Sequence, residues 1–172
     1  MKINNRKTIY NGFFKVENVT LEHHGNTLDR DLITAKNGVA ALVFDTAKQR
    51  YILTEQYRLP AQKNLVEIVA GLLDKENESP EKAITREIAE EIGYKVDKLE
   101  LLTHFYSSPG SYTEQIWLYY AEVSTKISAG GGLDSEHEDI KTVAFSPEKL
   151  FTHQFEDAKT LVSVLWEKCR VG

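Results

Sequence analysis

Apolar, aromatic and β-branched residues alternate with polar residues along most of this chain of 172 residues. Such alternation is typical of β-strands that bury one face. The polar, glycine-containing stretch His24–Asn26 separates the first two strands and predicts a hairpin turn. The strands predicted from this pattern are residues 12–23, 27–35, 39–44, 51–54, 65–69, 99–106, 114–123 and 140–145.

Two stretches have a helical period instead, residues 80–92 and residues 157–168. Ser79 is a favourable N-cap, Pro80 is favoured at the first helical position, and Gly93 permits a left-handed stop, so these residues bound the first helix. Helices scattered among antiparallel strands predict an α+β fold. The residues expected on the buried helix faces are Ile84, Ile88 and Ile92 in the first helix, and Leu161, Val164 and Leu165 in the second.

Three glutamates, Glu87, Glu90 and Glu91, lie beside the isoleucine face of the first helix, counting about 100° per residue. Glu87 and Glu91 are one turn apart, where like charges destabilise a helix by roughly a few tenths of a kcal/mol. One interpretation is an ordinary solvated acidic face, which is common on helices. The other is a metal site, because a hard cation such as Mg²⁺ binds carboxylate oxygens and relieves their repulsion.

The residues around these glutamates favour the metal site. Seven residues separate Glu78 from Arg86–Glu87, and the sequence continues through Glu90–Glu91 to Gly93, with Gly71 upstream. This run resembles the Nudix box, in which a glycine and a glutamate precede Arg-Glu-aliphatic-any-Glu-Glu-any-Gly. Six residues lie between Gly71 and Glu78, one more than is usual in the family, and Tyr94 replaces the usual aliphatic residue.

The resemblance implies a site for Mg²⁺, or alternatively Mn²⁺, on this helix. Glu87 and Glu91 would be the principal ligands, and Glu90 would bind directly or through water. Arg86 would act in catalysis by pairing with a glutamate and holding the shape of the site. The remaining members are the carbonyl of Ala70 as a further metal ligand, and Gly71, Glu78 and Gly93 as structural residues of the box.

Stretches outside the box resemble the Nudix branch that hydrolyses nucleoside diphosphate sugars. Arg58 ends a strand, where a guanidinium would suit a diphosphate, although many such arginines are simply exposed. Pro109 lies at a distance past the box that is typical of ADP-ribose pyrophosphatases. The branch carries its general base in a Glu-x-Glu-Asp-Ile pattern, which indicates Glu136, with Glu138 as the second choice. The residues expected to bind the substrate are Arg58, Glu67, Ser108 and Gly110.

The resemblance covers nearly the whole chain and implies the Nudix fold, a mixed β-sheet sandwiched between helices, with an N-terminal antiparallel β-sheet. Residues 1–36 are expected to serve dimerisation and to cover the substrate, and residues 37–172 to form the catalytic domain. A two-stranded unit is not stable alone and must pack on something. The resemblance implies that the N-terminal strands pack across a homodimer, which is also the commonest kind of oligomer.

The expected activity is Mg²⁺-dependent hydrolysis of the diphosphate linkage of a nucleoside diphosphate sugar. GDP-mannose or a similar substrate would give a nucleoside monophosphate and a sugar 1-phosphate. One alternative is an ADP-ribose pyrophosphatase that yields AMP and ribose 5-phosphate. The alternative of another class is a non-catalytic Nudix domain that senses a nucleotide sugar, but such domains usually lose box glutamates that are present here.

Composition narrows the choice of partners. The formal net charge of −5 gives no basic surface of the kind that binds nucleic acids. No apolar run approaches the roughly 20 residues of a membrane span. The basic start Met1–Lys7 has no apolar core and is not typical of a signal peptide, so we expect a cytoplasmic protein.

Overall fold

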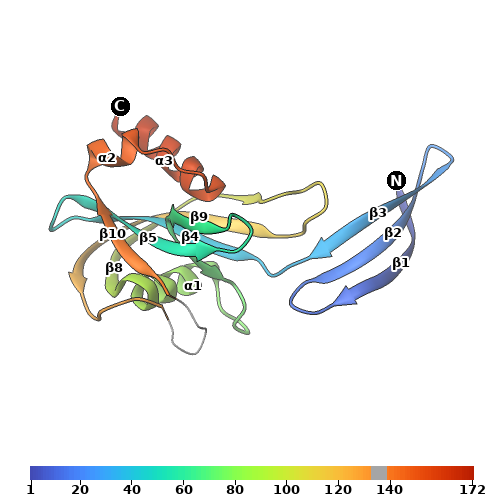
Figure 1. The fold of residues 1–172 in the computed structure, drawn as a ribbon, viewed down its shortest axis with the longest axis horizontal. Helices are drawn as coiled ribbons and strands as arrows, with labels where there is room; N and C mark the ends of the chain where they lie inside the picture. The colour runs from blue at the N-terminus through green and yellow to red at the C-terminus, as the bar shows by residue number, and fades with distance from the viewer. Residues whose placement is uncertain (133–138) are drawn as a thin grey trace. The chain divides into compact units, whose positions relative to one another are not determined.

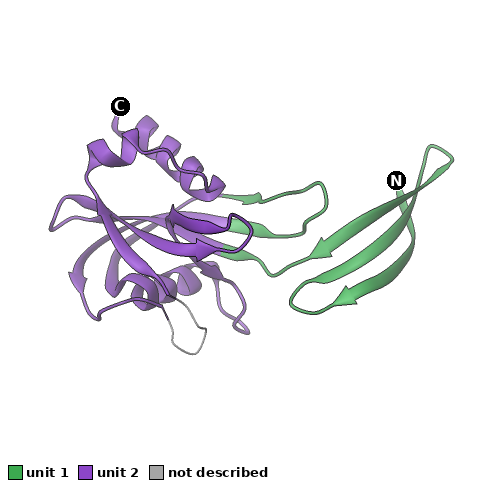
Figure 2. Cartoon of the chain, in the orientation of Figure 1, with its two compact units in different colours: residues 1–38, 104–116 green, residues 39–103, 117–172 purple. Residues whose placement is uncertain are grey.

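The computed structural model describes residues 1–132 and 139–172 and divides the chain into two compact units (Figure 2). The chain contributes two separate segments to each unit. Unit 1 consists of Met1–Gly38 and His104–Ile116, and unit 2 of Val39–Thr103 and Trp117–Gly172.

Unit 1 contains a three-stranded antiparallel sheet in the order β1-β2-β3. Its strands are β1 (Lys2–Asn11), β2 (Lys15–His23) and β3 (Asn26–Thr34). His24 and Gly25 form the hairpin turn with φ angles of 50° and 76°, which confirms the predicted turn. Strand β1 was missed by the sequence pattern, because every one of its residues is exposed and no buried face imposes an alternation.

Unit 2 is built on a larger sheet with the strand order β10-β5-β4-β9-β8, in which β6 also pairs with β5 and β7 with β4 (Figure 1). Its strands are β4 (Gly38–Asp45), β5 (Arg50–Arg58), β6 (Lys63–Glu67), β7 (Val69–Leu72), β8 (Tyr94–Tyr106), β9 (Gln115–Lys126) and β10 (Lys141–Phe145). The sequence pattern predicted a single strand at residues 65–69, which is wrong. Two strands, β6 and β7, meet there on either side of Ile68, and β6 pairs with β5 whereas β7 pairs with β4.

The helices of unit 2 are α1 (Pro80–Glu87), which continues as a π-helical turn η1 (Ile88–Ile92), α2 (Pro147–Thr152) and α3 (Ala158–Val171). Figure 1 shows α1 and α3 on opposite sides of the sheet. We refer to α1 and η1 together, residues 80–92, as the box helix. No helix in the two described segments of the chain is long and apolar enough to cross a membrane.

Both ends of the box helix lie where the sequence predicts them, but its last turn differs. The Ser79 side chain accepts a hydrogen bond from the Lys82 N–H at 3.4 Å, and Gly93 ends the helix with a φ of 75°. The Gly93 N–H donates to the carbonyl of Ile88, five residues back, so the final turn is π-helical rather than α-helical. A π-helical turn is rare and is frequently found at functional sites.

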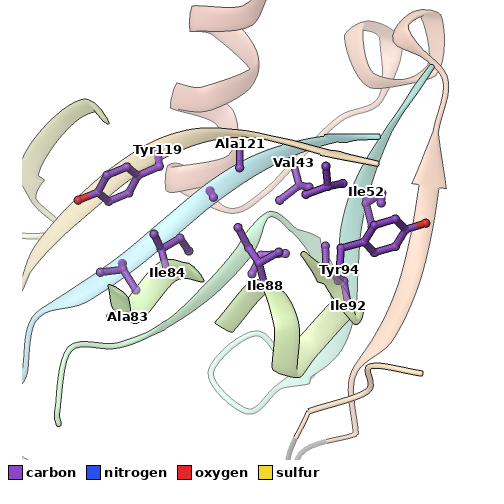
Figure 3. Packing of buried hydrophobic residues seen from close by; sticks show 13 residues of the cluster. Val43, Ile52, Ala83, Ile84, Ile88, Ile92, Tyr94, Tyr119 and Ala121 are labelled. Atoms are coloured by element: carbon purple, nitrogen blue, oxygen red, sulfur yellow. The ribbon is translucent and has the colours of Figure 1, made fainter. Parts of the chain in front are cut away.

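The isoleucines of the box helix form the core on one face of the sheet. Ile84, Ile88 and Ile92 have no exposed surface, as predicted, and Figure 3 shows them packed with residues of the strands such as Val43 and Ala121. Burying each of these side chains stabilises the fold by about 2 kcal/mol.

The buried face of α3 was predicted incorrectly. Leu161 is 40% exposed and Leu165 is 58% exposed, and only Val164 of the predicted set is buried. The other side chains that α3 buries are polar: Thr160, Ser163 and Glu167. Each accepts or donates a hydrogen bond inside the protein, so polar residues occupy a face that hydrophobic periodicity cannot detect.

Candidate functional site

Arg86 on the box helix binds three glutamates. Its Nε and Nη2 atoms donate to the two carboxylate oxygens of Glu78 at 3.1 and 3.0 Å. Its Nη1 atom donates to Glu87 at 2.7 Å and to Glu90 at 2.9 Å. The structure therefore brings the box residues Arg86, Glu78, Glu87 and Glu90 together.

This pairing favours the charged forms of Arg86 and Glu78. Hydrogen bonding to Glu78 is the main reason that the pKa of Arg86 is raised above its ordinary value. The same bonds lower the pKa of Glu78. One guanidinium faces three carboxylates here, so the group carries a formal excess of negative charge that a cation would neutralise.

The loop before the box helix contains the extra residue noted in the sequence. Asn77 has a φ of 62°, and the Glu78 N–H donates to the carbonyl of Lys75 at 3.2 Å. Asparagine is one of the few residues other than glycine that tolerate this left-handed conformation. A tight turn thus takes up the additional residue, and Glu78 still reaches Arg86.

Gly71 brings the strand β7 against the carboxylate of Glu87. A Cβ atom on Gly71 would lie 2.1 Å from Cδ and from Oε1 of Glu87, which is far shorter than any real contact. Only glycine permits this close approach. The carboxylate of Glu87 therefore lies against the backbone that immediately follows Ala70, the residue whose carbonyl was expected to bind the metal.

Arg58 and Glu67, both predicted to bind substrate, form a two-pronged ion pair. Arg58 Nε and Nη2 donate to the two oxygens of Glu67 at 2.7 and 2.8 Å. Hydrogen bonding to Glu67, with a smaller contribution from the charge of Glu91, raises the pKa of Arg58. Glu91 is only 2% exposed. The charge of Glu91 on the box helix is thus one of those that favour the protonated form of Arg58.

A second cation, Lys159, completes this ion pair. Its Nζ atom donates to Glu67 at 2.5 Å and to Asp157 at 2.9 Å. Burial alone would raise the pKa of Glu67, but the hydrogen bonds and positive charges of Arg58 and Lys159 outweigh it, and the pKa is lowered. Lys159 was not predicted, because 92 residues separate it from Glu67 and no local pattern indicates such a contact.

Asp157 connects this ion pair to Ile68, the residue between β6 and β7. It caps α3 by accepting hydrogen bonds from the backbone N–H of Thr160 at 2.9 Å and from its hydroxyl at 2.6 Å. The Thr160 hydroxyl oxygen accepts a bond from the N–H of Ile68 at 3.0 Å. The hydrogen bonds that start at Glu67 and Lys159 therefore reach the backbone of Ile68, two residues before Ala70.

Two of the residues predicted to bind substrate, Ser108 and Gly110, lie in a different compact unit from the box helix. Ser108 and Gly110 belong to unit 1, in the loop between β8 and β9, where the Ser108 carbonyl accepts a bond from the Tyr112 N–H at 3.0 Å. Gly110 has no neighbouring atom within 4 Å of an added Cβ. Glu136 and Glu138, the predicted general bases, lie outside the described residues.

The residues on the box helix fit a hard divalent cation by their chemistry. Carboxylates of Glu87, Glu90 and Glu91, with the nearby backbone of Ala70, offer the oxygen donors that Mg²⁺ and Mn²⁺ accept. Within residues 1–132 and 139–172, no three His, Cys, Asp or Glu side chains converge in metal-binding geometry. Arg86 holds one oxygen each of Glu87 and Glu90.

Comparisons with known proteins agree with these features. The model of the NUDIX domain matches residues 34–164. The chain is similar to proteins named GDP-mannose pyrophosphatase, at 32% identity in Escherichia coli (strain K12) and 30% in Enterobacter sp. (strain 638), each over 91% of this chain and 88% of the relative. A crystal structure of an "ADP compounds hydrolase" superposes with a TM-score of 0.83 at 21% identity, covering 99% of this chain and 93% of the other.

The structural match and the domain match confirm the expected α+β fold, with a mixed sheet between helices and an N-terminal antiparallel sheet. The N-terminal sheet has three strands rather than the two that the sequence pattern predicts.

Proposed function

This chain belongs to the Nudix family and is a hydrolase, and on that basis we propose that it cleaves the diphosphate linkage of a nucleoside diphosphate sugar. GDP-mannose or a similar substrate would yield a nucleoside monophosphate and a sugar 1-phosphate. The observation that carries the proposal is the intact box, in which Arg86 binds Glu78, Glu87 and Glu90. The names of the sequence relatives support a nucleotide sugar as the substrate.

Glu87, Glu90 and Glu91, together with the carbonyl of Ala70, would hold Mg²⁺ or Mn²⁺. When bound, such an ion neutralises negative charge on the diphosphate and makes a bound water more acidic. Arg86 pairs with two of these glutamates, Glu87 and Glu90, and would help to orient them toward the ion.

Arg58 would bind the diphosphate itself. Glu67 accepts hydrogen bonds from Nε and Nη2, which fixes the plane of the guanidinium, and we assign Nη1 to a phosphate oxygen of the substrate. Glu67 then acts by positioning Arg58, and Ser108 and Gly110 would contact the substrate from the loop between β8 and β9. Glu136 would take the proton of the attacking water, with Glu138 as the second choice.

The test is a comparison of purified protein on a panel of nucleotide sugars and ADP-ribose with Mg²⁺ at neutral pH. Alkaline phosphatase in the assay converts the monoester products, but not the diphosphate diester substrates, to inorganic phosphate. We expect GDP-mannose to have the highest kcat/KM. A tenfold advantage of ADP-ribose would overturn the preference for a guanine nucleotide, and no turnover of any member would overturn the proposed function.

A further inference from the structure

Three consecutive glycines, Gly130–Gly132, fasten the C-terminal end of the box helix. The Gly131 N–H donates to the carbonyl of Glu91 at 2.7 Å, and the Gly132 N–H donates to the carbonyl of Glu90 at 3.2 Å. The last carbonyls of a helix have no partner within the helix and must find one elsewhere. Here the glycine run supplies partners for two of those carbonyls, and both carbonyls belong to proposed metal ligands, Glu90 and Glu91.

The backbone of the run is accessible only to glycine. The φ angles of Gly130, Gly131 and Gly132 are 73°, 111° and 84°, in the region that side chains disfavour. A Cβ atom on Gly130 would also lie 2.7 Å from the carbonyl oxygen of Glu91 and 2.7 Å from the carbonyl carbon of Ile92. Any side chain there would displace the peptide that follows Glu91.

A second set of contacts holds the same end of the helix. The Gly93 carbonyl accepts bonds from the N–H groups of Ile127 at 2.7 Å and of Ser128 at 3.2 Å. A Cβ atom on Gly93 would lie 2.3 Å from the carbonyl oxygen of Ser128. The residues that follow β9 therefore contact the end of the π-helical turn. Hydrogen bonds from outside the helix thus hold this turn in place, in addition to the bonds within it.

We propose that Gly130–Gly132 is a positioning segment for metal binding, which fixes the backbone of Glu90 and Glu91 and so the directions of their carboxylates. The inference rests on the proposed metal site. Residues that orient metal ligands typically change metal affinity by about 10- to 100-fold when they are replaced. The glycine run would act in this way through main-chain bonds rather than through side chains.

The experiment titrates Mn²⁺ into the metal-free, full-length protein and follows free Mn²⁺ by electron paramagnetic resonance. Gly130→Ala is expected to weaken Mn²⁺ binding about tenfold or more, because its Cβ displaces the Glu91 peptide. Gly131→Ala is expected to weaken binding less, but still more than twofold. Its Cβ would meet nothing closer than the Ile140 carbonyl at 3.9 Å, but its φ of 111° is strained for any side chain. Circular dichroism of each variant reports whether it is folded.

Gly25→Ala is the matched control. Gly25 also has a positive φ, 76°, but an added Cβ meets no atom within 4 Å, so this variant introduces backbone strain without touching the box helix. It should bind Mn²⁺ like the unaltered protein. A folded Gly130→Ala with affinity within twofold of the unaltered protein would overturn the proposal. If Gly130→Ala does not fold, the same criterion applied to Gly131→Ala decides.

Glu91→Gln separates this inference from the proposed function beneath it. Loss of Mn²⁺ binding in Glu91→Gln, with normal binding in Gly130→Ala, would leave the metal site standing and remove only the role of the glycine run. Normal binding in Glu91→Gln, or no binding in the unaltered protein, would overturn the metal site itself.

Discussion

Glu91 is a buried carboxylate on the same helix as Glu87 and Glu90, with only 2% of its surface exposed. Replacing it by glutamine keeps its volume and removes one charge, so we expect Glu91→Gln to remain folded. Its metal-free melting temperature should be at least that of the unaltered protein. Its kcat with Mg²⁺ should fall by about three orders of magnitude or more, as expected for loss of metal catalysis. Steady-state assays and thermal melts in a chelator check both expectations.

The exposed Glu76 provides the control for that experiment, because Glu76→Gln makes the same chemical change in the loop before the box helix. It should retain activity. A Glu91→Gln enzyme with activity near that of the control would contradict the assignment of Glu91 as a metal ligand.

The proposed general base gives a second prediction about a single residue. Glu136→Gln is expected to lower kcat about 100-fold or more, the usual contribution of a positioned base, without altering the affinity for Mn²⁺. Glu138→Gln should have the smaller effect on kcat. Turnover measured for both variants, with metal titrations alongside, decides between them. A larger loss in Glu138→Gln would transfer the role to that residue.

Single residues also show what sequence could predict about the site. The resemblance to the box implied that Arg86 pairs with a glutamate. In the structure it binds Glu78, Glu87 and Glu90, which all lie on or next to one helix. The turn at Asn77 was not predicted. Its φ of 62° is a left-handed conformation that asparagine tolerates, but the presence of an asparagine does not by itself indicate it.

At the scale of elements, the ion pair between β5, β6 and α3 makes a prediction about pH. The pKa of Glu67 is lowered in the folded protein from 4.5, so its contribution to stability is present above about pH 4.5 and is lost as the pH falls through the folded value. Glu67→Gln should therefore reduce the free energy of unfolding by about 2 kcal/mol at neutral pH. The difference from the unaltered protein should shrink below pH 4.5. Urea denaturation over this pH range measures it.

Glu156→Gln is the control for exposed charge. Glu156 also pairs with a lysine, Lys63, at 2.7 Å, but both side chains are more than half exposed. Exposed pairs contribute little, so this variant should lose only about a few tenths of a kcal/mol. Equal losses in the two variants, or a Glu67→Gln deficit that does not change with pH, would count against a stabilising role of the buried pair.

The elements that sequence predicted well are those with a buried apolar face and strong end signals. The box helix has its isoleucines, its Ser79 cap and its Gly93 stop, and all were found where expected. Its π-helical turn was not predicted, because no simple residue pattern specifies the wider register. Helix α3 was placed correctly but oriented incorrectly, since Glu167 is buried through a bond from the hydroxyl of Tyr51, which lies 116 residues away in the sequence and so outside any local window.

At the scale of the whole molecule, we expect a homodimer. The sheet of unit 1 exposes apolar residues that a small protein does not usually leave in water: Ile3, Ile9, Tyr10 and Phe13 are all more than half exposed. A second copy packed against this sheet would cover them. Light scattering at micromolar concentration should give about twice the chain mass of 19.6 kDa. A monomer mass would contradict the expectation, and Phe13→Asp should shift a dimer toward monomer.

Unit 1 is built from two segments of the chain, residues 1–38 and 104–116, and this affects what a truncation of the N-terminus would do. The Ile33 N–H donates to the Ser111 carbonyl at 2.7 Å, and the Thr113 N–H donates to the Ile33 carbonyl at 3.0 Å, so β3 and the loop between β8 and β9 are bonded to each other. Deleting the first 38 residues would therefore remove the backbone partners of Ser111 and Thr113 and leave these groups to water. A truncation at the N-terminus thus also affects the loop between β8 and β9, about 70 residues further along the chain.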